Sequence, residues 1–139
     1  MSLRLIASLA LLTGCGTTIV PQETLAVRDF VIVSELESVD NIRLYRQLYY
    51  TYVNDHFLTV SVGSRHYLIE FGTSCRALRS ENFTPSMVDN RHDPSYLRTR
   101  DTIRGCPVHN IYKATAEELT EIKALSKEQT TGNVVLAEG

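Results

Sequence analysis

Hydrophobic and polar positions alternate most regularly in the middle of the chain. Residues 56–62 and 65–71 are rich in β-branched and aromatic side chains, and Gly63-Ser64 between them is a two-residue hairpin signal. This turn sets a register that pairs Val62 with Arg65, Val60 with Tyr67 and Leu58 with Ile69. Because side chains alternate between the faces of a strand, one face is expected to form the core. It carries Leu58, Val60, Val62, Tyr67, Ile69 and Phe71.

The opposite face is mixed, and the strand before the hairpin fits it less cleanly. It receives Thr59, Ser61, His66 and Glu70, with Phe57 and Leu68 as apolar exceptions. Residues 43–53 also read as a strand, followed by the turn signal Asn54-Asp55. A two-residue turn there would put Tyr50 and Tyr52 on this second face. Either the face is partly covered or the turn is one residue longer, because a one-residue slip exchanges the faces.

The remaining segments predict a mixed α+β domain. Asp29 to Val33 is β-branched and predicts a strand, residues 34–40 predict a turn or short helical piece, and residues 80–96 a long polar loop. Strand character returns at 102–103 and 108–112. A helix begins at Thr115, where Glu118 completes a capping box, and its apolar stripe is Leu119, Ile122 and Leu125. We therefore expect a mostly antiparallel curved sheet or partial barrel with a C-terminal helix.

The first fifteen residues have the pattern of an export signal. Arg4 precedes the apolar run Leu5 to Leu12, which is about half of the ~20 residues that a membrane-spanning helix needs. The ending Leu12-Thr13-Gly14-Cys15 resembles the lipobox of bacterial lipoproteins. The resemblance implies cleavage before Cys15, a diacylglycerol on its sulfur and an acyl chain such as palmitate on its amine. The alternative is a buried N-terminal helix with a chance cysteine.

These patterns divide the chain into four parts. They are a signal peptide (1–14), a lipidated tether (15–27), an α+β domain (28–128) and a flexible tail (129–139). Removal of the signal would leave 125 residues with a formal charge of −3, because Arg4 is the only charge removed. This mild acidity argues against nucleic acid as a partner.

The number of cysteines is consistent with export to an oxidising compartment. With Cys15 committed to lipid, Cys75 and Cys106 remain as an even pair in an oxidising compartment, which predicts a disulfide. The alternative is two free thiols. Their spacing matches no zinc pattern.

The histidines do not form a predicted metal site. In the register above, His56 and His66 point to opposite faces, and His92 lies in the polar loop beside Asp93. His109 follows Pro107 on a late strand. No nucleophile elbow or glycine-rich phosphate loop is present, so we assign no catalytic residue, metal or cofactor.

Arginines are concentrated around the cysteine loop. They are Arg76, Arg79, Arg91, Arg98, Arg100 and Arg104. Arg98, Arg100 and Arg104 are candidate anion-binding groups, because guanidinium groups recognise carboxylates and phosphates. The alternative is a solvated loop balanced by Asp89, Asp93 and Asp101.

Four segments resemble a family of small bacterial lipoproteins of unknown function. They are 29–43, 67–78, 97–106 and 111–112, of which the segment ending at Gly105-Cys106 is the most specific. The resemblance implies an envelope lipoprotein with a paired cysteine framework, and it implies no activity.

The combined expectation is a membrane-anchored envelope lipoprotein whose domain is a non-catalytic binding or structural module. Gly16 in place of Asp favours the outer membrane, facing the periplasm, by resemblance to lipoprotein sorting in Gram-negative cells. The expected partners are the membrane, through the lipid, and an envelope protein or cell-wall component. The alternative is a small periplasmic hydrolase or ligand-binding domain that uses His109 or the arginines.

Overall fold

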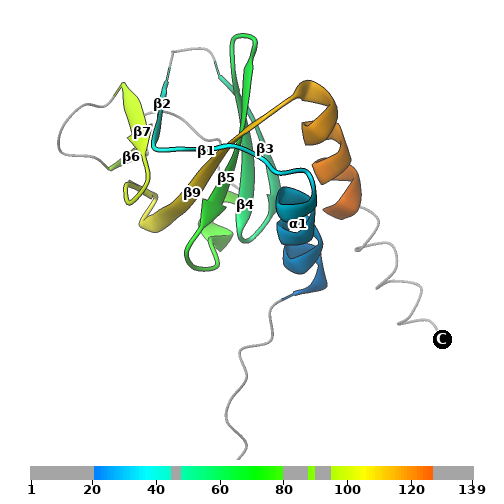
Figure 1. Ribbon diagram of the computed structural model, residues 1–139. Helices are drawn as coiled ribbons and strands as arrows, with labels where there is room; N and C mark the ends of the chain where they lie inside the picture. Colours follow the sequence, from blue (N-terminus) through cyan, green and yellow to red (C-terminus); the bar gives the residue numbers. More distant parts are fainter. Residues whose placement is uncertain (1–20, 45–47, 80–87, 90–94, 127–139) are drawn as a thin grey trace, which may run out of the picture.

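The computed structural model describes residues 21–44, 48–79, 88–89 and 95–126. These residues form an α+β fold in which a curled antiparallel sheet, with the form of a half-barrel, is flanked by two helices (Figure 1). The fold class predicted from the sequence is confirmed. The signal segment with Cys15, most of the polar loop with Arg91 and His92, and the tail 129–139 lie outside the described residues.

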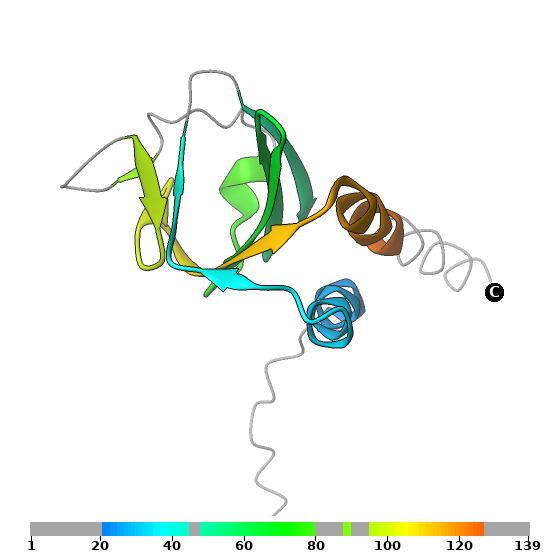
Figure 2. The same ribbon diagram turned by 45° about the horizontal axis from the view of Figure 1, so that its top comes forward.

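The sheet is built around the long strand β9. Its order is β3 (Tyr49–Asn54), β4 (Phe57–Val62), β5 (Arg65–Phe71), β9 (Cys106–Ala114), β8 (Thr102–Ile103) and β6 (Val88–Asp89). A short strand, β1 (Ser38–Val39), also pairs with β9. The pair β2 (Asn41–Arg43) and β7 (Tyr96–Arg98) forms a second small sheet. Figure 2 shows the curl, with β2 standing across the interior from β4 and β5.

The β4–β5 hairpin has the predicted register. Val62 pairs with Arg65, Val60 with Tyr67 and Leu58 with Ile69. Gly63 has a φ of 62° and a following residue of negative φ, the conformation of a type II′ turn, which a glycine adopts without steric cost. The predicted core face is the concave face of the sheet. All six of its apolar side chains belong to one buried cluster with residues of β2, β7, β8 and β9.

The turn before β4 differs from the prediction. Asn54 pairs with Phe57, so the turn is Asp55-His56 rather than Asn54-Asp55, and a bulge lies at Val53. The cause is local: Asn54 Oδ1 accepts a hydrogen bond from the His56 backbone N–H at 2.9 Å, an Asx turn that holds Asn54 inside the strand. Upstream of the bulge, Tyr52 therefore packs against the concave cluster instead of joining Phe57.

Residues 29–33 are helical, and the predicted strand there is wrong. They belong to α1 (Gln22–Val33), which starts inside the segment expected to be a tether. Thr24 and Val27 are buried, and Val31 packs on the same side one turn further on. This three- and four-residue spacing places one stripe of α1 on the sheet, and packing on that stripe overrides the strand preference of the β-branched residues.

The second helix covers the same side of the sheet as α1. It spans residues 116–126 and begins with the predicted capping box. The Thr115 N–H donates to Glu118 Oε2 at 2.9 Å, and the Glu118 N–H donates to Thr115 Oγ1 at 3.1 Å. The two helices pack on the convex face through a second apolar cluster: Val27, Val53, Phe57, Leu68, Leu119 and Ile122. No helix within the described residues combines the length and apolar character that crossing a membrane requires.

Candidate functional site

A buried carboxylate lies beneath α1 on the convex face. Glu70 of β5 is only 7 % exposed, and three donors surround it. Arg28 Nε lies 3.2 Å from Oε1, while Asn110 Nδ2 and the Tyr112 hydroxyl donate to Oε2 at 3.0 and 3.3 Å. Arg28 comes from α1 and the other two donors from β9. Glu70 therefore ties the helix and two strands together, and we call these four residues the Glu70 cluster.

The electrostatics of the Glu70 cluster keep Tyr112 protonated. Burial and the neighbouring Glu70 carboxylate raise the pKa of Tyr112 from its usual 10 to about 12. The phenol thus remains a hydrogen-bond donor to Glu70 throughout the physiological range. A small cavity of about 190 Å³ adjoins the cluster, and Val31, Ile32 and Phe57 form its apolar wall. The arrangement has the character of a structural network, because donors from two elements converge on a single acceptor group.

His56 lies close to this cluster, in surroundings that disfavour its charged form. Its Nδ1 is 3.3 Å from Thr24 Oγ1 of α1. Burial, and then the positive charge of Arg28, lower its pKa, although Asp55 and Glu70 partly oppose the shift. His56 thus faces α1, on the convex side, and the prediction that it points to the opposite face from His66 is wrong. The cause is the shifted turn, which places His56 outside the β4 ladder.

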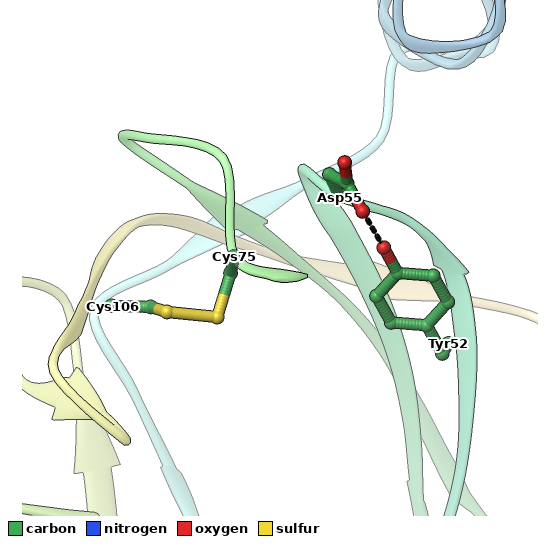
Figure 3. The surroundings of a disulfide bond; sticks show 4 residues. All are labelled: Tyr52, Asp55, Cys75 and Cys106. Atoms are coloured by element: carbon green, nitrogen blue, oxygen red, sulfur yellow. Dashed lines mark hydrogen bonds between the residues drawn. A yellow bond between two sulfur atoms is a disulfide. The ribbon is translucent and has the colours of Figure 1, made fainter. Parts of the chain in front are cut away.

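A second carboxylate fastens the 3₁₀ helix η1 (Arg76–Arg79) to the β3–β4 turn. Asp55 accepts a hydrogen bond from the Tyr52 hydroxyl, as Figure 3 shows, and pairs with Arg76 Nε at 3.3 Å and Arg79 Nη2 at 3.1 Å. Its backbone carbonyl accepts from the Cys75 N–H at 2.6 Å. Two of the clustered arginines therefore have a structural partner within the fold.

Cys75 and Cys106 form the predicted disulfide (Figure 3). Their Cα atoms are 5.7 Å apart, within the range that such a bond requires. Cys75 lies just before η1, and Cys106 begins β9, where it pairs with Ile103 of β8. Together with Asp55, the disulfide fixes η1 against one end of the sheet.

The three candidate anion-binding arginines lie on β7 and the two turns that follow it. All three are exposed: Arg98 ends β7, Arg100 lies in the turn before β8, and Arg104 in the turn between β8 and β9. Their local geometry is firm, because Asp101 Oδ2 accepts from the Arg98 N–H at 2.7 Å and the Arg100 N–H donates to Val108 at 2.9 Å. Anion binding by these residues stays a prediction.

The other histidines are separated in space. His66, at the start of β5, has its Nδ1 2.8 Å from the Ser61 hydroxyl oxygen, and His109 is exposed on β9. His56 precedes β4, and His66 pairs with Ser61 near the other end of β4, which separates the two histidines by roughly 17 Å at ~3.4 Å per residue. In the part of the chain that the structure describes, no three histidine, cysteine or acidic side chains are placed to hold a metal ion.

Two larger cavities open at the two ends of the helix pair. One, of about 540 Å³, lies between the end of α1, the β4–β5 turn and the start of the C-terminal helix. The other, of about 570 Å³, lies between the start of α1, the β3–β4 turn, Arg79 of η1 and Ser126. We call the latter the turn cavity. From the sequence, Asn54-Asp55 is only a turn signal. The cavity is not predicted, because the sequence pattern favours a tether and a strand where α1 lies.

Comparison with known proteins finds a family model that covers most of the chain. Residues 1–133 match a family described as a family of unknown function, DUF6491. No curated protein and no solved structure matches the chain. The matched range includes Cys15, the disulfide, the Glu70 cluster and the turn cavity.

Proposed function

Because the chain belongs to the DUF6491 family, whose description assigns no activity, we propose a function from its own residues. The protein is a bacterial envelope lipoprotein, anchored through lipid at Cys15, and its folded domain is a non-catalytic binding module. The observation that carries this proposal is the Cys75–Cys106 disulfide. Disulfides persist in oxidising compartments such as the bacterial periplasm, and the export signal with its lipobox-like ending leads to the same compartment.

The placement of the buried charges supports binding over catalysis. A general base needs a lone pair directed at substrate, whereas Glu70 accepts from three donors and Asp55 is surrounded by Tyr52, Arg76 and Arg79. Both carboxylates hold elements of the fold together. The concave interior of the sheet is filled by apolar side chains. What the domain offers a partner is its surface and the open cavities at the ends of the helix pair.

The position of α1 implies that only a short tether joins the lipidated Cys15 to the folded domain. The helix begins at Gln22, seven positions after Cys15. A chain of this length spans at most about 25 Å when extended. The folded domain would therefore sit close to the membrane surface, with its partner at that surface or in the adjacent cell wall.

The anchor is tested by mass and by fractionation. Intact mass of the membrane-extracted protein should show loss of residues 1–14 and added acyl mass on Cys15, and a clickable palmitate analogue should label it. Cys15→Ser should abolish labelling and release the protein from membranes. Gly16→Asp should keep the label but move the protein from outer to inner membrane fractions. Unchanged processing and fractionation of Cys15→Ser would refute the lipid anchor.

The binding role is tested by chemical crosslinking in intact cells followed by purification of the crosslinked protein. A discrete crosslinked species that is also formed by His109→Ala supports a binding module, because the alternative is a hydrolase or ligand-binding domain that uses His109 or the arginines. Loss of the envelope phenotype in His109→Ala, with fold and crosslinks retained, would favour catalysis instead.

A further inference from the structure

The turn cavity has the size of a small-molecule site and walls from four separate elements. Its volume of about 570 Å³ lies within the ~300–1,000 Å³ of typical ligand pockets. The start of α1, the β3–β4 turn, η1 and the end of the C-terminal helix contribute to it. The disulfide and Asp55 hold η1 in place, and the Ser126 hydroxyl donates to the Val53 carbonyl at 2.7 Å, so three of these walls are fixed to one another.

One wall residue carries a buried donor that the fold leaves without a partner. Asn54 is 7 % exposed, and its Nδ2 has no hydrogen-bond partner among the described residues. The orientation of the amide is set by Oδ1, which accepts from the His56 N–H. An unsatisfied buried donor costs about 1–3 kcal/mol, so a ligand oxygen at this position would recover free energy. Asn54 is among the residues that line the turn cavity, beside Asp55 and Arg79.

The charges around the cavity favour a neutral ligand. Glu23 and Asp55 line it with carboxylates, and Arg79 lines it with a guanidinium group. An anion would face the two carboxylates, while a cation would face Arg79 and the Asn54 donor. A ligand whose groups both donate and accept hydrogen bonds suits this mixture best, and hydroxyl and amide groups have that property.

We propose that the turn cavity binds a neutral sugar unit, with a hydroxyl or acetamido oxygen accepting from Asn54 Nδ2. This names the ligand class of the binding module proposed above and rests on that proposal. The sugar can belong to a cell-wall glycan or to a free oligosaccharide, because both present the same neutral hydroxyl and amide groups.

The test is an NMR titration of the full chain in mild detergent. Its probes are N,N′-diacetylchitobiose, cellobiose and inorganic phosphate. A saturable shift of the Asn54 side-chain amide with either disaccharide, at least tenfold tighter than with phosphate, supports the proposal. Asn54→Asp should weaken binding at least tenfold yet keep the fold, because its carboxylate still accepts from the His56 N–H. Arg79→Met is a second lining variant that should weaken binding. Arg65→Met, exposed at the start of β5 and outside the lining, is the matched control.

The outcomes distinguish the sugar site from the binding module proposed above, and a cell-wall glycan from a free oligosaccharide as the source of the sugar. Sedimentation with insoluble cell-wall glycan, lost in Asn54→Asp, identifies the polymer as the source, whereas binding of disaccharide alone identifies a free sugar. Absence of saturable shifts with either disaccharide, or a response to phosphate alone, overturns the sugar site. A discrete crosslinked species in cells would then still support the binding module.

Discussion

Arg28 Nε lies 3.2 Å from Glu70 Oε1, and this contact joins a surface helix to a buried position in the sheet. The two side chains differ in environment, since that of Arg28 is 38 % exposed and that of Glu70 10 %. Removing one partner therefore has unequal consequences. Without Arg28, Glu70 keeps two donors; without Glu70, Arg28, Asn110 and Tyr112 all lose their acceptor.

The first prediction follows from this asymmetry. Arg28→Ala should lower the free energy of unfolding by about 1 kcal/mol, because the contact is partly screened by solvent. Glu70→Ala should lower it by about 2–4 kcal/mol, because several buried donors are left unsatisfied. Urea unfolding measures both. Asp29→Ala, exposed on the same helix, is the control and should change stability by no more than about 0.5 kcal/mol. Equal small losses for Arg28→Ala and Glu70→Ala would contradict the network.

The second prediction concerns alkaline pH. The pKa of Tyr112 is raised to about 12 in the folded protein, above its unfolded value near 10. Its contribution to stability is therefore fully present below pH 10 and is lost as the pH rises through 12. Absorbance of tyrosinate should show one tyrosine that ionises late, and Tyr112→Phe should remove that step. If Tyr112→Phe instead removed a tyrosine that ionises near pH 10, Tyr112 would not be donating to the Glu70 carboxylate.

The sequence predicts the hairpin well because its information is local there. Gly63-Ser64 sets the β4–β5 register, and the capping box at Thr115 starts the C-terminal helix, each through contacts between near neighbours. Phe57 and Leu68, the apolar exceptions on the opposite face, are buried because two helices cover them. The sequence does not predict this covering helix, because the β-branched residues 29–33 favour a strand.

The candidate sites depend on contacts between residues far apart in the sequence, so the sequence alone predicts little of them. Glu70 meets its partners 40 and 42 positions away, and neither the spacing nor the composition of the chain records those contacts. The turn cavity needs both the bulge at Val53 and the start of α1. One signal was available: an asparagine two residues before His56 can form an Asx turn, which would have moved the turn to Asp55-His56.

The third prediction is the contribution of the disulfide. Cys75 and Cys106 are 31 positions apart, and closing a loop of that length stabilises the folded state by about 3–4 kcal/mol in the loop-entropy model. Reduction, or the double change Cys75→Ser and Cys106→Ser, should lower the free energy of unfolding by roughly that amount. The reducing agent should have no further effect on the double variant, which is the control. Free-thiol labelling of both cysteines in the native protein would rule the disulfide out.

The last prediction concerns the end of α1. The Leu36 N–H donates to the Val31 carbonyl and the Glu35 N–H to the Ile32 carbonyl, each at 3.2 Å, which is the hydrogen-bond pattern of a Schellman motif. Leu36 and Val31 both pack against the second apolar cluster, on the convex face, and apolar residues at these two positions frequently accompany the motif. Its left-handed position, where glycine is the usual residue, is occupied by Glu35 with a φ of 51°.

Glu35→Gly should therefore stabilise the protein, by about 0.5–1 kcal/mol, because glycine adopts a left-handed conformation without the steric cost of a Cβ atom. The matched control is Ser34→Gly at the neighbouring position, where φ is −82° and glycine only adds conformational entropy to the unfolded chain. That variant should be neutral or less stable. Urea unfolding of the two variants side by side measures the difference. If Glu35→Gly lost as much stability as Ser34→Gly, α1 would not end in this motif.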